Sequence, residues 1–303
     1  MKLPVFLFFL LGCFFNGRTQ NLSSIKTDAE CLNFIRKNID NFDNFYFDTL
    51  FTQEQIIKQN IKDPYKNWGI LDFNNDKKPD LFFAGKRKVP YTSGYTAELY
   101  LSNNKNEYDL IHLSRNLWDS YKPLVFYRPY NSQKFLFVYR ISTYDGSTTD
   151  SIVAIKQHLY PKGIKAIDTL VYKHDHVINF AKESSKLEFD SLYYKTNWGI
   201  SGKIYKNGNV SLYQLRGKEI EKTLKAESST ISLLKKLVFE IDLKSTDPDY
   251  SSGYATDKGY ISLIIYTKGK EITLNDSGLR STYTLMAIYK LIWLIEGERV
   301  EKL

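Results

Sequence analysis

The 303-residue sequence has few of the residues that build disulfides, metal centres and common active sites. It contains two cysteines and four histidines, so neither a disulfide framework nor a histidine-rich zinc site is expected. It also contains no Gly-x-x-x-x-Gly-Lys, His-Glu-x-x-His, Gly-x-Ser-x-Gly or Cys-x-x-Cys motif. These absences argue against nucleotide hydrolysis, zinc proteolysis and serine hydrolysis, and they favour a protein that is not an enzyme.

The sequence also lacks an obvious membrane-spanning segment at its start. The apolar run at residues 3–15 is too short to cross a bilayer. It follows a basic residue and precedes the polar stretch 16–20, which is the layout of a secretory signal peptide. The sequence therefore predicts export to the periplasm or to the outside of the cell.

Two cleavage sites are compatible with this signal. Cleavage after Thr19 makes residues 1–19 the signal peptide and starts the mature chain at Gln20. Alternatively, residues 10–13 resemble a lipoprotein signal, in which Cys13 would be lipidated and would anchor the protein to the outer membrane. Contact with a membrane is expected only in this second case. In the first case Cys31 remains as a single thiol, and the apolar face of a predicted helix at 27–39 buries it.

Charge excludes one class of partner. The formal net charge is +8, and it falls by two if Lys2 and Arg18 leave with the signal. The tight basic run at residues 86–88 favours a solvated turn, with contact to an anionic surface or glycan as the alternative. Because the charge is spread thinly and the chain is exported, nucleic acid is not an expected partner.

Oxygen-bearing side chains recur at alternate positions of one loop between two apolar runs. Asp72, Asn74, Asp76 and Asp80 occupy positions one, three, five and nine, and Lys78 at position seven can offer its backbone carbonyl. Calcium prefers six to eight oxygen ligands, so this spacing predicts a calcium site. The alternative is an Asp/Asn-rich turn whose side chains bond their own backbone.

Residues 68–85 resemble the calcium loop of FG-GAP and VCBS-type repeats. The shared pattern is Gly-x-x-Asp-Phe-Asn-x-Asp-x-x-x-Asp-Leu, which starts at Gly69. The resemblance implies that the same four side chains ligate a structural calcium and that the flanking strands form part of a propeller blade. The usual glycines after the second and third ligands are replaced by Asn75 and Lys77. The loop has no second copy, so a full propeller is not expected.

The first part of the chain, residues 20–186, is predicted to be a β-rich domain. Two helices are expected at 27–39 and 52–61, the second behind a capping box that starts at Thr52. Short aromatic and β-branched runs with polar turns then predict an antiparallel meander. These runs are 70–71, 81–84, 97–101, 108–113, 124–127, 135–139, 151–157, 164–172 and 177–180.

The second part, residues 187–303, is predicted to be an α+β domain of order β-β-β-α-β-β-α. Its strands are expected at 187–195, at 201–215 folded into a type I′ turn at Asn207-Gly208, and at 260–266 with 271–274. Helices are expected at 230–241 and 281–296. This order resembles an uncharacterised family of small exported bacterial α+β domains, and the resemblance implies no activity. The predicted fold class is therefore α+β and β-rich, a meander with two N-terminal helices followed by this unit.

Other residue groups offer weaker candidates. His174 and His176 would lie on one side of a strand and could contact zinc or copper, but a turn is the simpler interpretation. An acidic stretch could provide the two carboxylates of a glycan- or cell-wall-active hydrolase. It comprises Glu240, Asp242, Asp247, Asp249 and Asp257. The favoured function is a non-catalytic binding module for extracellular glycan or protein, with one structural calcium; such a hydrolase is the alternative.

Overall fold

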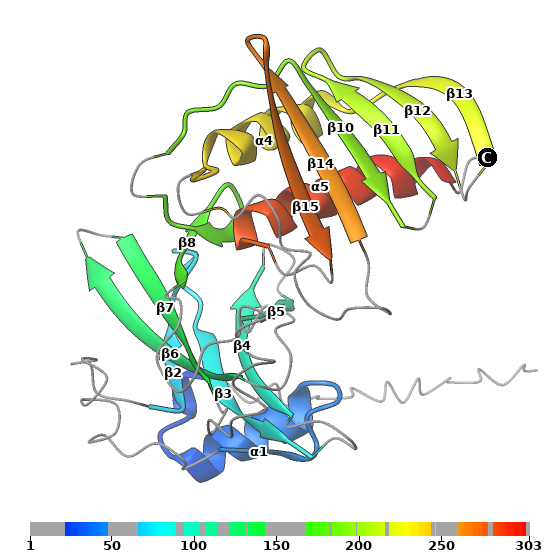
Figure 1. Cartoon of the computed structure of the whole chain (residues 1–303). Coiled ribbons are helices and arrows are strands. Elements are labelled where there is room, and N and C mark those ends of the chain that lie inside the picture. The colour runs from blue at the N-terminus through cyan, green and yellow to red at the C-terminus, as the bar shows by residue number, and fades with distance from the viewer. Residues whose placement is uncertain are drawn as a thin grey trace, which may run out of the picture.

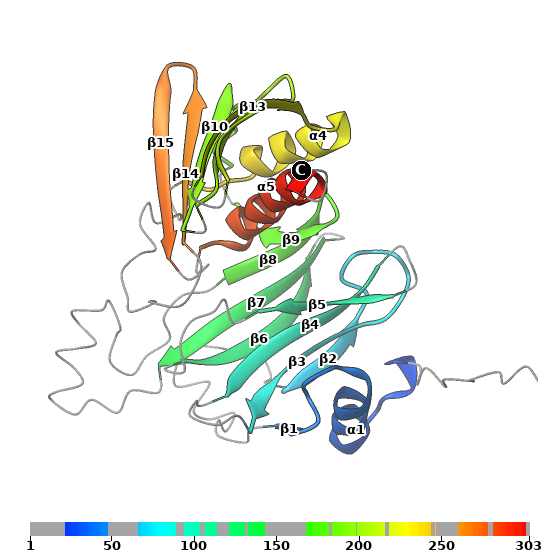
Figure 2. The same cartoon turned by 90° about the vertical axis from the view of Figure 1, so that its right-hand side faces the viewer.

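The computed structural model describes most of the chain beyond the predicted signal peptide. The described residues are 22–47, 66–88, 94–103, 107–113, 121–130, 133–142, 168–181, 184–197, 199–215, 218–243, 246, 260–277 and 281–300. They form three antiparallel sheets, with α1 packed on the first sheet and α4 and α5 on one face of the third, as Figures 1 and 2 show. No helix in these ranges is long and apolar enough to cross a membrane.

The first sheet carries the predicted calcium loop. Its strand order is β1-β3-β4-β5, and β2 also pairs with β3. The bounds are β1 (Phe45–Tyr46), β2 (Trp68–Leu71), β3 (Asp80–Arg87), β4 (Tyr95–Ser102) and β5 (Tyr108–His112). Helix α1 (Asp28–Asn38), preceded by the 3-10 turn η1 (Leu22–Ser24), packs on one face. A capping box between Thr27 and Glu30 begins this helix, because each side chain accepts the other's backbone N–H.

The second sheet lies between the other two. Its order is β6-β7-β8-β9, with bounds β6 (Tyr121–Tyr130), β7 (Gln133–Ser142), β8 (Asp168–Lys173) and β9 (His176–Asn179). Leu170 and Val177 pack with the first sheet, whereas their neighbours Val171 and Ile178 join the core of the third. All four side chains are buried. Each of β8 and β9 therefore has two adjacent apolar residues and not the alternation of apolar and polar residues that a strand with one exposed face shows.

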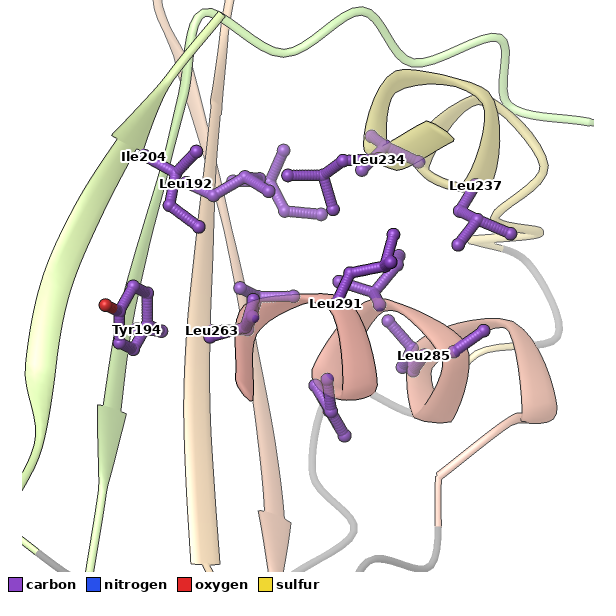
Figure 3. Close-up of a cluster of buried hydrophobic side chains, with 14 of the residues drawn as sticks. Leu192, Tyr194, Ile204, Leu234, Leu237, Leu263, Leu285 and Leu291 are labelled. Atoms are coloured by element: carbon purple, nitrogen blue, oxygen red, sulfur yellow. The ribbon is translucent and has the colours of Figure 1, made fainter. Parts of the chain in front are cut away.

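Among the described residues, helices cover one face of the third sheet and leave the other face uncovered. Its order is β13-β12-β11-β10-β14-β15. The strands are β10 (Ser191–Thr196), β11 (Ser201–Tyr205), β12 (Asn209–Leu215), β13 (Lys218–Lys225), β14 (Tyr260–Thr267) and β15 (Lys270–Ser277). Helices α4 (Ser228–Phe239) and α5 (Tyr283–Val300) pack on the inner face. Figure 3 shows Leu192 and Leu263 of this sheet on the side that faces Leu234 of α4 and Leu285 of α5, and Tyr194 belongs to the same buried cluster.

Two reciprocal hydrogen bonds join the second sheet to α5. The backbone N–H of Asn179 donates to Thr284 Oγ1 at 3.2 Å, and the N–H of Tyr283 donates to Asn179 Oδ1 at 2.6 Å. The second bond satisfies one of the N–H groups that the start of a helix leaves unpaired. The start of α5 is therefore fixed to β9. The predicted boundary between residues 186 and 187 remains a prediction.

The fold class predicted from the sequence is wrong in all but its α+β label. The meander is divided into two sheets, because β6 stacks face to face on the first sheet and buries the apolar side chains of both. In the third sheet, four strands (β10–β13) precede α4, where three were predicted for the second domain. The missed strand is β13, with the sequence KEIEKTLK, an edge strand whose charged residues give no clear apolar pattern.

Within the described residues, the prediction of two N-terminal helices is also wrong. The described residues contain one α-helix in this region, α1, and the second helix, predicted at 52–61, lies outside them. The predicted signal peptide 1–19, with Cys13, and the predicted strand 151–157 lie outside the described residues as well.

Candidate functional site

The predicted calcium loop is the turn that joins β2 to β3. The two strands pair up to Leu71 and Asp80, which lie opposite each other, so the loop is a closed hairpin end. Within it Asn75 and Lys77 have φ of 64° and 68°. This left-handed conformation favours glycine, and Asn adopts it more readily than Lys. The backbone is therefore left-handed at the two positions where the resembling repeats carry glycine.

Two side chains of the loop bond their own backbone. Asn74 Oδ1 accepts the N–H of Asp76 at 3.2 Å, and Asp76 Oδ1 accepts the N–H of Lys78 at 2.8 Å. Both span two residues, the pattern of an Asx-turn. They agree with the alternative interpretation of the sequence, in which the loop is stabilised locally, and they leave Asp76 Oδ2 directed elsewhere.

Asp80 is the buried anchor of the loop, with none of its surface exposed. Its Oδ2 accepts the N–H of Phe73 at 2.6 Å, and its Oδ1 accepts the N–H of Ser102 at 2.8 Å. Burial raises the pKa of Asp80, and the hydrogen bonds from Ser102 and Phe73 offset only part of that effect. The carboxylate therefore ties the loop to the end of β4 and would gain from a nearby positive charge.

One hydroxyl lies between two carboxylates of the loop. Ser102 Oγ lies 2.7 Å from Asp76 Oδ2 and 2.8 Å from Asp80 Oδ1. A hydroxyl has one proton to donate, so it cannot donate to two ionised carboxylates at once. Burial alone would raise the pKa of Asp76, but hydrogen bonds from Ser102, Lys78 and Asn74 lower it. The second contact would become favourable if Asp80 carried a proton that it donated to Ser102, or if a cation bound between the two carboxylates.

The remaining predicted ligands are placed differently. Asp72 Oδ2 pairs with Lys134 Nζ of β7 at 3.1 Å, while Asp72 Oδ1 is buried and has no hydrogen-bond partner among the described residues. Asn74 Nδ2 donates to the Ser102 carbonyl at 2.7 Å. The structure therefore brings Asn74, Asp76 and Asp80 together around Ser102 and holds Asp72 toward the second sheet.

These residues meet some requirements of a calcium site and miss others. They supply two adjoining carboxylates that share one proton donor, together with an unpaired buried oxygen on Asp72. Against this, no group of three or more His, Cys, Asp or Glu side chains in the described parts of the chain is arranged to hold a metal. Hard cations also accept amide, hydroxyl and carbonyl oxygens, which such a group does not include. The donor chemistry fits calcium.

Sequence reasoning missed Ser102, which lies 22 residues beyond Asp80. It also missed a second polar cluster on the same face of β4. There Thr96 donates to the carboxylate of Glu98, and His112 Nδ1 of β5 lies 2.7 Å from Glu98 Oε1. Glu98 is only 3 % exposed, so this cluster pairs a buried acid and joins β4 to β5. Strand alternation from residue 96 to 102 is the signal that places these side chains on one face.

Among the described residues, the histidine pair considered from the sequence is not joined by the further side chains that a zinc site needs. His174 Nε2 lies 3.4 Å from Glu240 Oε1, and His176 Nδ1 lies 2.9 Å from the His174 carbonyl. Glu240 also accepts Lys173 Nζ at 3.1 Å through both oxygens. The residues thus join the β8–β9 turn to the end of α4.

The contacts of Glu240 give little support to the alternative of a hydrolase with two catalytic carboxylates. Glu240 is engaged with Lys173 and His174, and residues 247, 249 and 257 lie outside the described residues.

The single thiol in the described residues, Cys31, is fully buried, as the sequence predicts. Burial, and to a smaller extent the charge of Asp28, raises its pKa to about 12. A thiol with such a pKa is protonated at neutral pH and is a poor nucleophile.

Comparison with known proteins adds little to this picture. No family model matches the chain, and no curated protein matches it. One solved structure is weakly similar, the GH32 beta-fructofuranosidase BmSUC1 of Bombyx mori, with a TM-score of 0.25 and 6% sequence identity. The match covers 72% of this chain, and it spans about half, 51%, of the length of that enzyme. Similarity at this level supports no inference about fold or activity.

Proposed function

We propose that this is an exported, non-catalytic binding module whose β2–β3 loop holds one structural calcium ion. The observation that carries the calcium proposal is the placement of Asp76 and Asp80 on either side of the single Ser102 hydroxyl. A divalent cation would allow both carboxylates to be ionised at once. Export is inferred from the apolar segment at residues 3–15.

The ligands of this ion would come from one loop. Asp72, Asn74, Asp76 and Asp80 would supply side-chain oxygens, and Lys78 would supply its backbone carbonyl. The buried oxygen of Asp72 that has no partner among the described residues supports its inclusion. The left-handed backbone at Asn75 and Lys77 supports the resemblance to FG-GAP and VCBS-type loops. Bound calcium would supply a fixed positive charge that holds the hairpin end against β4.

The effect on stability should be measurable but modest. Extracellular calcium sites commonly bind at roughly 10⁻⁴ to 10⁻³ M. At ten times the dissociation constant, binding adds about 1.4 kcal/mol to the free energy of unfolding. For a chain of this size that corresponds to a rise of roughly 2–3 °C in the melting temperature.

The test compares melting curves of the mature chain in calcium, in magnesium and in chelator. We expect calcium to raise the melting temperature and magnesium to do so less, because magnesium requires a stricter octahedral geometry. Asp76→Asn should abolish the calcium effect. Asp109→Asn, which changes an exposed carboxylate on β5, should keep it. Identical wild-type curves in calcium and chelator would reject the calcium site.

The binding role is proposed for extracellular glycan or protein. It draws on the export signal and on the absence of common catalytic motifs from the sequence. It does not depend on calcium, because the loop would act on the stability of the first sheet.

A further inference from the structure

The outer face of the third sheet carries an unusual set of side chains. Residues that alternate with the buried core positions of β10, β11, β12 and β14 point away from α4 and α5. Among them are Tyr193, Tyr205, Tyr213, Tyr266 and Lys203, which we call the tyrosine face. Figures 1 and 2 show both helices on the opposite side of this sheet. Among the described residues no helix or strand covers the tyrosine face.

Strand register brings these side chains into neighbouring rows. Tyr193 of β10 lies opposite Lys203 of β11, and Ser191 lies between Tyr205 on one side and Tyr266 on the other. Directly paired residues on adjacent strands point to the same face, with their strands about 4.8 Å apart. The rings of Tyr193 and Tyr213 are 6.3 Å apart between centroids, with an interplanar angle of 30°.

Tyr213 lies at an irregularity in β12. The pairing of β12 with β13 shifts between Leu212 and Gln214, so Tyr213 lies outside the regular register. Such bulges redirect a side chain, and Tyr213 is 39% exposed. Tyr213 therefore adds a fourth exposed ring to this face, beside Tyr193.

Lys203 lies at the centre of the tyrosine face. Its Nζ is 4.4 Å from the ring centroid of Tyr266 and 5.5 Å from that of Tyr205. No described carboxylate forms an ion pair with it. The ring faces hold the ammonium group by cation–π attraction and leave its charge uncompensated by an acid. Lys195, two residues along β10 from Tyr193, adds a second exposed positive charge on this face.

The chemistry of this face favours one kind of occupant. A surface that packs against another protein sheet is dominated by aliphatic side chains, whereas here each ring carries a hydroxyl, and small polar residues such as Ser191 and Ser211 lie between the rings. Flat rings with polar edges match sugar rings, whose faces present C–H groups and whose edges present hydroxyls. An unpaired lysine among them matches a negatively charged sugar substituent.

We propose that the tyrosine face binds an acidic polysaccharide, with sugar rings stacked on its tyrosines and a carboxylate of the polymer paired with Lys203. The inference deepens the proposed binding function by naming the surface and the class of ligand, and it rests on that function but not on the calcium loop. The alternation of rings and polar groups across several strands suits an extended polymer that crosses the sheet.

The experiment measures binding of the mature chain to polygalacturonate, alginate and hyaluronate by titration calorimetry in EDTA. Methyl-esterified polygalacturonate has the same backbone without the charge. We expect binding to at least one acidic polymer and, for polygalacturonate, at least tenfold weaker binding of the ester. Lys203→Gln should bring that ratio toward one. Tyr193→Ala should weaken binding to the acidic polymer at least fivefold.

Matched controls lie on other surfaces of the molecule. Tyr130→Ala removes a tyrosine that is 66% exposed at the end of β6, and Lys236→Gln removes an exposed charge on α4. Both should bind as wild type does, and circular dichroism is used to check that every variant is folded. If the controls lose as much affinity as the face variants, the binding is non-specific attraction and the proposal fails.

Other outcomes also overturn the proposal. The proposal is rejected if the protein binds none of the three acidic polymers. It is also rejected if polygalacturonate and its methyl ester bind with equal affinity. Self-association that Tyr193→Ala abolishes, without polymer binding, would identify a second copy of the chain as the occupant. Because EDTA is present throughout, failure here leaves the calcium-dependent melting test unaffected, and failure of that test leaves polymer binding unaffected.

Discussion

The hydrogen bonds of Asp80 make a quantitative prediction about the first sheet. Its two oxygens accept the N–H groups of Phe73 and Ser102 at 2.6 and 2.8 Å, and the carboxylate is fully buried. In Asp80→Asn an NH2 group, which donates hydrogen bonds, replaces one of the two accepting oxygens. In either amide orientation, a donor then faces the backbone N–H of Phe73 or of Ser102.

The cost of this change follows from the unpaired donor. A buried hydrogen-bond donor left without an acceptor costs about 1–3 kcal/mol. Removal of a buried charge offsets part of this loss, because burial disfavours the ionised carboxylate. We expect a net loss of about 2 kcal/mol in the free energy of unfolding. For a chain of this size the melting temperature should fall by roughly 3–4 °C.

The assay is thermal unfolding followed by circular dichroism in EDTA, so that any bound calcium does not contribute. Asp109→Asn is the matched control, because it makes the same chemical change at an exposed position of β5. Its free energy of unfolding should change by no more than about 0.5 kcal/mol. An Asp80→Asn protein that melts at the wild-type temperature would refute the view that this carboxylate holds the loop to β4.

The remaining predictions concern pH and one glycine. Because the folded pKa of Asp80 is raised above its usual 3.8, the folded state binds its proton more tightly than the unfolded state, so this group's contribution to stability falls as pH rises above 3.8. The lowered pKa of Asp76 acts oppositely, so its contribution to stability is lost as pH falls below 3.8. Urea unfolding measured on both sides of pH 3.8 should show stability decreasing as pH rises above 3.8 in wild type but not in Asp80→Asn. Gly85→Ala should destabilise by about 1–3 kcal/mol in the same assay, because its Cβ would lie 2.4 Å from the Tyr46 carbonyl oxygen; an unchanged midpoint would contradict the close approach of β1.

Helical periodicity was the most informative feature of the sequence for local structure. The apolar spacing at 27–39, 230–241 and 281–296 locates α1, α4 and α5 to within a few residues, because each of these helices buries apolar side chains. The arrangement of strands into sheets was not predictable in the same way. β8 and β9 are buried on both faces, so their sequences carry no alternation to show which sheet each face meets.

Turn chemistry shows a similar limit. Asn207-Gly208 predicts a type I′ turn with both residues at positive φ, but only Gly208, at 88°, has one, so that prediction is wrong. The type I′ pattern occurs instead at His174 and Asp175, with φ of 55° and 60°. Residue preference indicates where a left-handed backbone has a low conformational free-energy cost. The register of the flanking strands decides where it is used, and at β8–β9 the contact of His174 with Glu240 adds to the stability of the turn.

Ser102 shows why the candidate calcium loop could be only partly predicted. The spacing of Asp72, Asn74, Asp76 and Asp80 is local, so the sequence reveals it, whereas the hydroxyl between Asp76 and Asp80 comes from another strand. Alternation along β4 predicts that Ser102 shares a face with Glu98, but it does not predict what lies opposite. That depends on the pairing of β3 with β4, which places Leu81 opposite Tyr100 and so brings the end of β4 against the loop. The contact of Ser102 with both carboxylates is therefore a property of the sheet, and it distinguishes this loop from an isolated Asp/Asn-rich turn with the same sequence.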